Sequence, residues 1–252
     1  MNKTALITGA TAGIGEATAL LLAKNGYNII ITGRRGSRLE QLKKKIESET
    51  KAEVLSLTFD VRKLPEVKQA ISSLDKKWKQ IDVLVNNAGL SVGLSHIDKG
   101  EIDDWERMID TNIKGLLYVT REVSPLMVER KSGHIINIAS IAGKEVYDGG
   151  NVYCATKHAV DALSKSMRID LLHDNIKVTN IAPGMVETEF SIVRFKGDKE
   201  RADKVYQGLT PLFAQDIAEA ILFVVTRPEH VCINDMLIMP MAQAAVAHVL
   251  RT

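Results

Sequence analysis

Short apolar runs alternate along the chain with longer segments in which apolar residues recur every three or four positions. The first pattern indicates buried strands, and the second indicates amphipathic helices. The predicted strands are Thr4–Thr8, Asn28–Thr32, Glu53–Phe59, Ile81–Asn86, His134–Ala139, Lys177–Ile181 and Asp235–Met239. The predicted helices are Gly15–Asn25, Arg38–Glu49, Leu64–Lys77, Asp103–Arg130, Val152–His173 and Ala214–Thr226.

Strands that alternate with helices predict right-handed β-α-β units and a mostly parallel sheet, which defines an α/β fold. Ile29–Ile31 and Val83–Val85 are apolar throughout, which is typical of strands buried on both faces. No linker or low-complexity segment divides the 252 residues. We therefore expect a single domain over residues 1–252.

Composition and charge exclude several classes of function. The net charge is +2, with 45% hydrophobic and 25% charged residues, so no basic field favours a nucleic-acid partner. Cys154 and Cys232 lie far apart and lack metal-ligand spacing, so we expect neither a disulfide nor a metal site. No apolar stretch approaches the roughly 20 residues of a membrane helix, and a cytoplasmic location without membrane contact is expected.

A glycine-rich turn follows the first predicted strand and opens a helix. Glycines let the backbone approach a pyrophosphate, whose charge a helix N-terminus favours. The spacing Gly-x-x-x-Gly-x-Gly also suits methyltransferases or a plain tight turn, but its place at the first strand–helix junction favours nucleotide binding. The predicted contacts are Gly9, Thr11, Ala12, Gly13, Ile14 and Gly15.

The second predicted strand ends in Thr32-Gly33-Arg34-Arg35. An NAD enzyme commonly places an acidic residue there, about 20 residues after the glycine turn, to bind the ribose 2′-hydroxyl. Guanidinium groups instead suit a 2′-phosphate, so Arg34 and Arg35 predict NADP (NADPH) as the cofactor. The alternative is that both arginines are ordinary surface charges.

Two further loops are predicted to lie at the same carboxyl edge of the sheet, where open α/β folds bind ligands. Asp60 and Val61 end the third strand, and the Asp60 carboxylate is placed to accept a hydrogen bond from an adenine amino group. The fourth strand ends before Asn87, Ala88 and Gly89. Asn and Gly also terminate strands routinely. A role in cofactor binding is predicted for these residues because the other loops at this edge carry nucleotide-binding motifs.

Tyr153 and Lys157 are one helical turn apart and therefore share a helix face. A lysine ammonium there would stabilise the phenolate and lower the tyrosine pKa from about 10. Such a phenol can exchange a proton with an alcohol or carbonyl. The spacing is common on surface helices, so the prediction depends on the nucleotide motifs upstream.

These motifs, together with Thr111–Gly115, Ser140 and Pro183-Gly184, occur in an order that resembles the short-chain dehydrogenase/reductase family. The resemblance implies a Rossmann-type, doubly wound sheet of about seven strands in the order 3-2-1-4-5-6-7, with helices on both faces. It also implies a nicotinamide cofactor and a homotetramer.

The same resemblance assigns roles to individual residues. Tyr153 would be the general acid or base, and Lys157 would lower its pKa and bind the nicotinamide ribose. Ser140 would bind the substrate oxygen, and Asn112 would hold a water that relays protons through Lys157. The nicotinamide end would also contact Pro183, Gly184, Val186 and Thr188.

Three segments, 147–153, 190–198 and 234–240, are similar to the NADP-dependent 3-hydroxy acid dehydrogenases, which include serine 3-dehydrogenases and malonic semialdehyde reductases. That resemblance implies an enzyme acting on CH–OH groups. It would interconvert serine, allo-threonine or 3-hydroxypropionate with their 3-oxo forms.

A 3-hydroxy acid needs a cation for its carboxylate. Arg194, in a predicted substrate lid around residues 186–210, is the first candidate, and Lys144 is the second. The alternative is that Arg194 is a mobile surface residue or fixes the lid to the body.

Three other functions stay open at this point. A 3-oxoacyl-thioester reductase of the same superfamily usually has a glycine-rich segment after the last strand, whereas this chain continues Ile238-Met239-Pro240-Met241. A non-catalytic NADPH-binding sensor is a second alternative. The intact set of Asn112, Ser140, Tyr153 and Lys157 argues against a sensor. A methyltransferase is the third alternative, but its chemistry does not require the Tyr–Lys pair.

Overall fold

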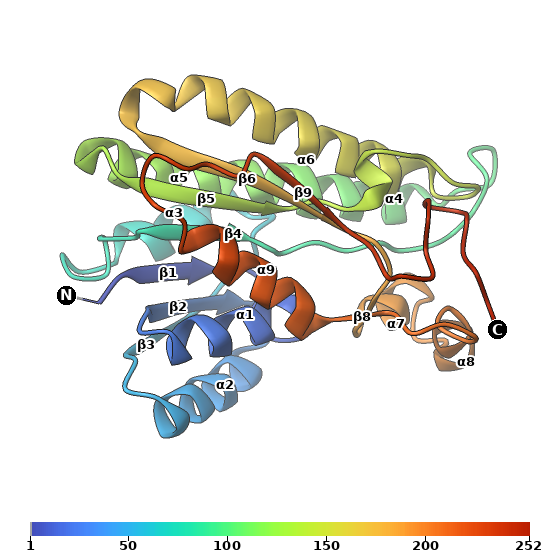
Figure 1. Cartoon of the computed structure of the whole chain (residues 1–252), viewed down its shortest axis with the longest axis horizontal. Helices are drawn as coiled ribbons and strands as arrows, with labels where there is room; N and C mark the ends of the chain where they lie inside the picture. The colour runs from blue at the N-terminus through green and yellow to red at the C-terminus, as the bar shows by residue number, and fades with distance from the viewer. Residues whose placement is uncertain (1) are drawn as a thin grey trace.

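Seven parallel strands form the central sheet of the computed structural model, which describes residues 2–252 (Figure 1). Their order is β3-β2-β1-β4-β5-β6-β9, which confirms the predicted order apart from the number of the last strand. The strands are β1 (Thr4–Ile7), β2 (Asn28–Gly33), β3 (Val54–Thr58), β4 (Val83–Asn86), β5 (Gly133–Ile138), β6 (Ile176–Pro183) and β9 (Asp235–Ile238).

Helices cover both faces of this sheet. One face carries α1 (Gly13–Lys24), α2 (Gly36–Glu49) and α9 (Ala214–Val225). The other carries α3 (Leu64–Ser72), α5 (Leu116–Arg130) and α6 (Asn151–Asp170). Successive residues of a strand point to opposite faces. Ile29 and Ile31 therefore pack in the first core and Ile30 in the second, as the continuous apolar run predicts.

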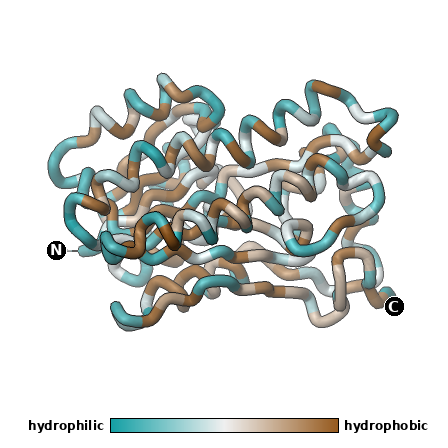
Figure 2. The backbone as a smooth tube through the Cα atoms, turned by 90° about the horizontal axis from the view of Figure 1, so that it is seen from above, coloured by the Kyte–Doolittle hydropathy of each residue, from teal (hydrophilic) through white to brown (hydrophobic). Residues whose placement is uncertain are grey.

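The outer helices alternate between hydrophilic and hydrophobic residues, which is the pattern expected of helices with one buried face (Figure 2). In α2, the buried residues Leu39, Leu42 and Ile46 recur at helical spacing. No helix within residues 2–252 has both the length and the apolar character needed to cross a bilayer.

Two predicted helices differ from the observed ones. The segment predicted as Leu64–Lys77 is helical only to Ser72. Beyond it, the Asp75 carboxylate accepts hydrogen bonds from the backbone N–H groups of Lys77 and Trp78, both at 3.0 Å. Such local side-chain bonds compete with helix continuation, which is the physical reason for the error.

The long helix predicted over Asp103–Arg130 is divided. It consists of α4 (Ile102–Ile109), a π-helical segment η1 (Asp110–Gly115) and α5. π-Helical insertions occur often at functional sites. This one contains Asn112, which is one of the predicted catalytic residues.

Small elements gather beyond the carboxyl ends of the strands, within and beside the predicted lid (Figure 1). They are β7 (Val186–Glu187), α7 (Phe190–Arg194), α8 (Lys199–Lys204) and β8 (Leu212–Phe213). β7 pairs in parallel with β8 to form a second, two-stranded sheet that sequence patterning does not predict. Strands of two residues are too short to carry a periodicity.

The C-terminal segment, residues 240–252, fastens this region to the body of the protein. The Gln243 side chain accepts a hydrogen bond from the Met185 backbone at 2.8 Å, immediately after β6. Arg251 donates to the Val205 carbonyl at 3.1 Å, and Thr252 N–H donates to the Gly208 carbonyl at 2.9 Å. The segment therefore holds both ends of the lid.

His134 on β5 is buried, and its Nε2 lies 2.8 Å from Thr179 Oγ1 on β6. Burial, and to a lesser extent the charge of Lys177, lower its pKa from 6.5 to about 3. In the unfolded chain the imidazole of His134 is therefore protonated below about pH 6.5, whereas in the folded protein it stays neutral down to about pH 3. Its contribution to stability is complete above pH 6.5 and is lost as the pH falls through this window.

We expect this linkage to lower the free energy of unfolding by roughly 2 kcal/mol at pH 5 relative to pH 8. His134→Gln removes the titrating group, so its unfolding free energy should fall less over the same range. Urea unfolding at several pH values measures the difference between the two proteins. Parallel pH dependences would contradict the assignment to His134.

Candidate active site

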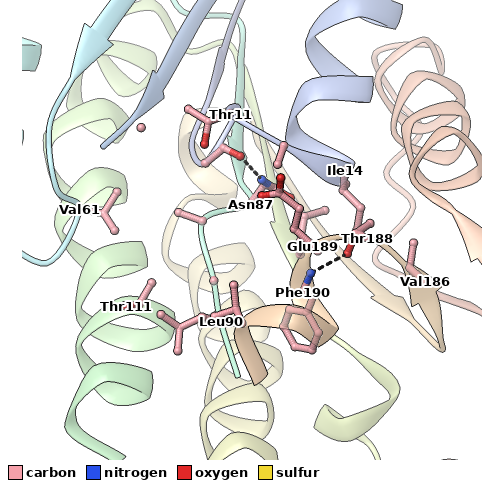
Figure 3. Close-up of a pocket in the computed structure, with 18 of the residues that line it drawn as sticks. Thr11, Ile14, Val61, Asn87, Leu90, Thr111, Val186, Thr188, Glu189 and Phe190 are labelled. Atoms are coloured by element: carbon pink, nitrogen blue, oxygen red, sulfur yellow. Dashed lines mark hydrogen bonds between the residues drawn. The ribbon is translucent and has the colours of Figure 1, made fainter. Parts of the chain in front are cut away.

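A cavity of about 360 Å³ lies at the carboxyl edge of the sheet (Figure 3). Most of the residues predicted to bind the cofactor or substrate line it, although they come from separate loops. They are Gly9, Thr11, Ala12, Gly13, Ile14, Arg34, Arg35, Asp60, Val61, Asn87, Ala88, Gly89, Ser140, Tyr153, Lys157, Pro183, Gly184, Val186 and Thr188. Gly15, Asn112 and Arg194 are predicted site residues that do not line it.

The glycine turn is packed so closely that side chains are excluded. Gly13 has a positive φ of 57°, and a Cβ there would lie 3.1 Å from the Thr188 methyl group. A Cβ on Gly15 would lie 2.5 Å from Asn87 Nδ2, so Gly15 acts through packing. Asn87 Nδ2 also donates to the Thr8 carbonyl at 2.8 Å. The loop after β4 thereby fixes the shape of the turn.

The arginine pair lies beside the glycine turn, and its two members have different surroundings. Arg34 Nη1 is 4.0 Å from Asp60 Oδ2, and 60% of its side chain is exposed. Arg35 donates to Thr11 Oγ1 through Nε at 3.0 Å and Nη2 at 2.7 Å. Its Nη1 lies 2.9 Å from the Glu189 carboxylate, which sequence reasoning missed.

Asp60 is held by an arginine that sequence reasoning also missed. Arg62 Nη2 donates to Asp60 Oδ2 at 2.6 Å, and Arg62 Nε lies 3.0 Å from both carboxylate oxygens. Although burial raises the pKa of Asp60, the hydrogen bonds and charge of Arg62 outweigh it and lower the pKa below its ordinary value. Asp60 is therefore an ionised acceptor at neutral pH.

Tyr153 and Lys157 are both buried, with 7% and 6% of their surface exposed. Lys157 Nζ donates to the Ile138 carbonyl at 2.8 Å and lies 5.9 Å from the centroid of the Tyr153 ring. Burial lowers the pKa of Lys157 to about 8. The ammonium form still predominates at neutral pH.

The predicted lowering of the tyrosine pKa is wrong for this structure. Burial raises the pKa of Tyr153 above its ordinary value, and the charge of Arg194 and a hydrogen bond with Ser140 only partly oppose this. Lys157 does not contribute to the shift. The phenol consequently keeps its proton at neutral pH.

Ser140 follows β5 and begins the short 3₁₀ helix η2 (Ile141–Gly143). Its hydroxyl oxygen accepts a hydrogen bond from Ala142 N–H at 3.1 Å and lies 3.4 Å from the Pro183 carbonyl oxygen. These contacts orient the hydroxyl at the cavity beside Tyr153.

Asn112 is 2% exposed and holds the loop after β4. Its Oδ1 accepts from Leu90 N–H at 2.9 Å, and its Nδ2 donates to the Leu90 carbonyl at 2.8 Å and Thr156 Oγ1 at 3.0 Å. A Cβ on Gly89 would lie 3.3 Å from Asn112 Oδ1 and 3.5 Å from Lys157 Nζ. Asn112 and Lys157, two of the four predicted catalytic residues, therefore both lie close to Gly89.

Arg194 lies beside Tyr153 although it does not line the cavity. Its guanidinium carbon is 5.3 Å from the centroid of the Tyr153 ring and 5.1 Å from that of Phe190. Its Nε and Nη2 lie 3.2 Å from Ser91 Oγ and 3.0 Å from Tyr147 Oη. Sequence reasoning missed these aromatic and hydroxyl partners, which are distant in the chain.

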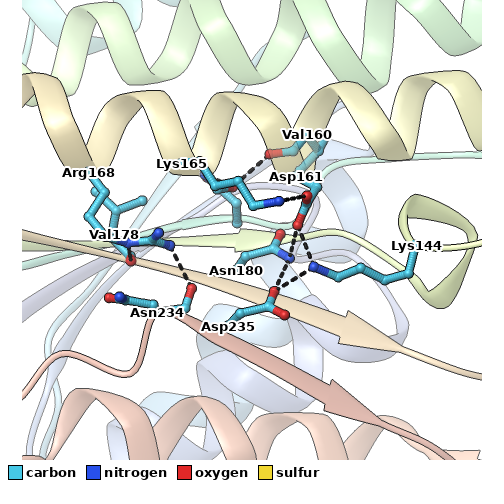
Figure 4. A network of polar contacts seen from close by, with 11 residues as sticks. Lys144, Val160, Asp161, Lys165, Arg168, Val178, Asn180, Asn234 and Asp235 are labelled. Atoms are coloured by element: carbon cyan, nitrogen blue, oxygen red, sulfur yellow. Dashed lines mark hydrogen bonds and ion pairs between the residues drawn. The ribbon is translucent and has the colours of Figure 1, made fainter.

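Lys144, the second candidate for the substrate carboxylate, does not line the cavity. Its ammonium is bound by Asp161 of α6 and by Asp235 of β9, the latter at 3.0 Å (Figure 4). Asn180 Nδ2 of β6 completes the network through Asp235 Oδ1 at 2.6 Å. The prediction for Lys144 is wrong because two carboxylates already neutralise it.

The cavity has the features that an elongated phosphate-bearing cofactor requires. A glycine turn at a helix N-terminus lies near one arginine pair, and a buried ammonium lies at the other end. Thr111 lines the cavity, and its buried Oγ1 has no hydrogen-bond partner within the described residues. The residues present therefore fit a dinucleotide.

Residues 3–199 match the family model described as short chain dehydrogenase. Because this match covers most of the chain, the protein belongs to the short-chain dehydrogenase family. It is accordingly an oxidoreductase of the alcohol dehydrogenase type.

Similar proteins have more specific names. The NADP-dependent 3-hydroxy acid dehydrogenase YdfG of Salmonella typhi is 51% identical over 240 residues, which are 95% of each chain. The NADP-dependent 3-hydroxy acid dehydrogenase of Schizosaccharomyces pombe is 45% identical over 251 residues, covering 99% of this chain and 97% of that one. The solved closed form of serine dehydrogenase complexed with NADP+ has 46% identity and a TM-score of 0.92 over 99% of both chains.

We propose that Arg34 and Arg35 supply the positive charge for a 2′-phosphate. Replacing both by Gln should raise the dissociation constant of NADPH by about tenfold more than that of NADH, because only NADPH carries the 2′-phosphate. Fluorescence titration of both cofactors measures the two effects. An equal loss for the two cofactors would refute the assignment.

Proposed function

We propose that the protein is an NADP-dependent oxidoreductase that interconverts small 3-hydroxy acids and their 3-oxo forms. Serine, allo-threonine and 3-hydroxypropionate represent the substrate class. The observation that carries this proposal is the position of the Arg194 guanidinium beside the Tyr153 ring, 5.3 Å from its centroid. A cation for the carboxylate and a phenol for the hydroxyl thus lie in one small region.

The cofactor would lie between the glycine turn, Arg34 and Lys157. When bound, NADP accepts or supplies the hydride, and the protein is left to orient the reactants and handle the proton. Lys157, held by the Ile138 carbonyl, is suited to donate hydrogen bonds to ribose hydroxyls. The loop Pro183–Thr188 would complete the nicotinamide end. The NADP-dependent relatives support this choice of cofactor.

Tyr153 is proposed to move the proton at the substrate oxygen. Its raised pKa keeps the phenol protonated at neutral pH, which suits a general acid for carbonyl reduction. Oxidation requires the phenolate instead, so its rate should increase as the pH rises toward the tyrosine pKa. Ser140 would hold the same oxygen by a second hydrogen bond, and Asn112 would support the proton path beside Lys157.

Arg194 is the proposed anchor for the substrate carboxylate. Two of its nitrogens are oriented by Ser91 and Tyr147, which leaves Nη1 without a protein partner within the described residues. The proposed lid, residues 186–210, would then bring this cation over the substrate and exclude water, as lids commonly do.

The lid is joined to the loop before α4 and to α4 itself by two further contacts. The Arg194 carbonyl accepts a hydrogen bond from Gly93 N–H at 3.0 Å, and Lys196 Nζ lies 2.7 Å from Asp104.

We also propose a cytoplasmic homotetramer, as the family resemblance implies. Exposed apolar side chains at the end of α6 and on the edge strand β9 support self-association: Ile169 is 73% and Leu237 49% exposed. The mass in solution, measured by light scattering, tests this part of the proposal.

The substrate class is tested by steady-state kinetics with NADP against 3-hydroxy acids, their methyl esters and 3-oxoacyl thioesters. We expect the free acids to have kcat/KM values about tenfold or more above those of the esters, because only the acids pair with Arg194. Arg194→Gln should remove this preference while leaving turnover of neutral substrates nearly unchanged. A preference for thioesters in the wild-type protein would favour the acyl-thioester reductase instead.

Tyr153→Phe removes only the hydroxyl group. We expect kcat to fall by about a thousandfold or more, because general acid–base catalysis contributes on the order of 10² to 10⁴ and the substrate oxygen also loses a hydrogen bond. NADPH binding, measured by fluorescence titration, should stay within about twofold of wild type. Retained turnover would contradict the proton-transfer role, and inactivity of wild type across all carbonyls would favour the sensor.

A further inference from the structure

The Glu189 carboxylate forms ion pairs with two arginines that belong to a different part of the chain. Its Oε2 lies 2.9 Å from Arg35 Nη1, and its Oε1 lies 2.7 Å from Arg38 Nη1. The hydrogen bond from Arg35 and then that from Arg38 outweigh burial and lower the pKa of Glu189. The carboxylate is therefore charged at neutral pH.

These ion pairs join the beginning of the lid to the loop after β2, and Arg35 and Glu189 both line the cavity. Glu189 is the N-cap residue of α7 and stands at the beginning of the lid. Arg35 is the N-cap residue of α2, and Arg38 lies in its first turn. Arg35 also donates to Thr11 of the glycine turn at 2.7 and 3.0 Å. The Glu189 carboxylate thus ties the beginning of the lid to the start of α2, and Arg35 ties both to the glycine turn. We call Glu189, Arg35 and Arg38 the strap.

Arg34 and Arg35 differ in how many of their N–H groups are bonded to the protein. Arg35 uses three of its five N–H groups on Thr11 and Glu189. Among the polar contacts within residues 2–252, Arg34 forms only the 4.0 Å one with Asp60, and 60% of its side chain is exposed. Arg34 is therefore the arginine whose donors are free for a 2′-phosphate, whereas those of Arg35 are largely occupied by the protein itself.

We propose that the strap retains the bound dinucleotide by holding the beginning of the lid against the loop after β2 that carries Arg34 and Arg35, the arginine loop. Discrimination for the 2′-phosphate belongs mainly to Arg34. The strap contacts the walls of the site, so it slows the release of NADPH and NADH alike. The inference rests on the cofactor part of the proposed function and is independent of which hydroxy acid is the substrate.

The test measures dissociation rate constants of NADPH and NADH by stopped-flow displacement, with nicotinamide fluorescence as the signal. Glu189→Gln should accelerate release of both cofactors by about three- to tenfold, the range expected when two half-exposed ion pairs are lost. Arg34→Gln should accelerate release of NADPH by a similar or larger factor and leave release of NADH within about twofold.

Arg38→Gln offers a sharper variant, because Arg38 does not line the cavity. It should accelerate release of both cofactors by less than Glu189→Gln does. The double variant of Arg38 and Glu189 should release no faster than Glu189→Gln alone, since the two residues form one interaction. Glu200→Gln is the matched control: this lid carboxylate pairs with Lys204 and should leave both rates unchanged.

Salt provides a second readout. Raising the ionic strength to about 1 M screens exposed ion pairs, so release of NADH from wild type should approach that from Glu189→Gln. Unchanged release in Glu189→Gln, or faster release of NADPH alone, would overturn the strap. Failure of the cofactor assignment has a different signature, because Arg34→Gln would then affect NADPH and NADH equally.

Discussion

The central sheet is parallel throughout, and this constraint determines where the chemistry of the molecule lies. Helices bury both faces of the sheet, so polar side chains with a chemical task are confined largely to the edges. Parallel strands bring all their carboxyl ends to the same edge. The glycine turn after β1, Arg34 after β2, Asp60 after β3 and Ser140 after β5 therefore meet around one cavity although they are far apart in sequence.

Much of the fold could be predicted because buried parallel strands are continuous apolar runs. The strand predicted at Asn28–Thr32 is observed as Asn28–Gly33, and the predicted strand order is confirmed. The errors arise where local hydrogen bonding overrides periodicity. Asp75 ends α3 early, and a π-helical segment interrupts the helix around Asn112. Apolar spacing does not encode either feature.

Only those parts of the site that lie within a local sequence motif could be predicted. Residues within one loop, such as Gly9 to Ile14, follow from a glycine pattern. Arg35 and Glu189 are 154 positions apart, and no local pattern reports their contact. The same limit explains the errors at Lys144 and Tyr153. The carboxylates that neutralise the lysine, and the packing that raises the pKa of the tyrosine, come from segments brought together by the tertiary fold.

The attachment of residues 240–252 has a consequence for the order of folding. Gln243 fixes the backbone after β6, and Arg251 and Thr252 bind the far end of the lid. Synthesis proceeds toward the C-terminus, so the glycine turn and the loop after β2 emerge before residues 240–252. The lid at residues 186–210 gains its contacts with residues 240–252 only after that segment has been synthesised. A growing chain can therefore contain the phosphate-binding residues before the lid that encloses the site is attached.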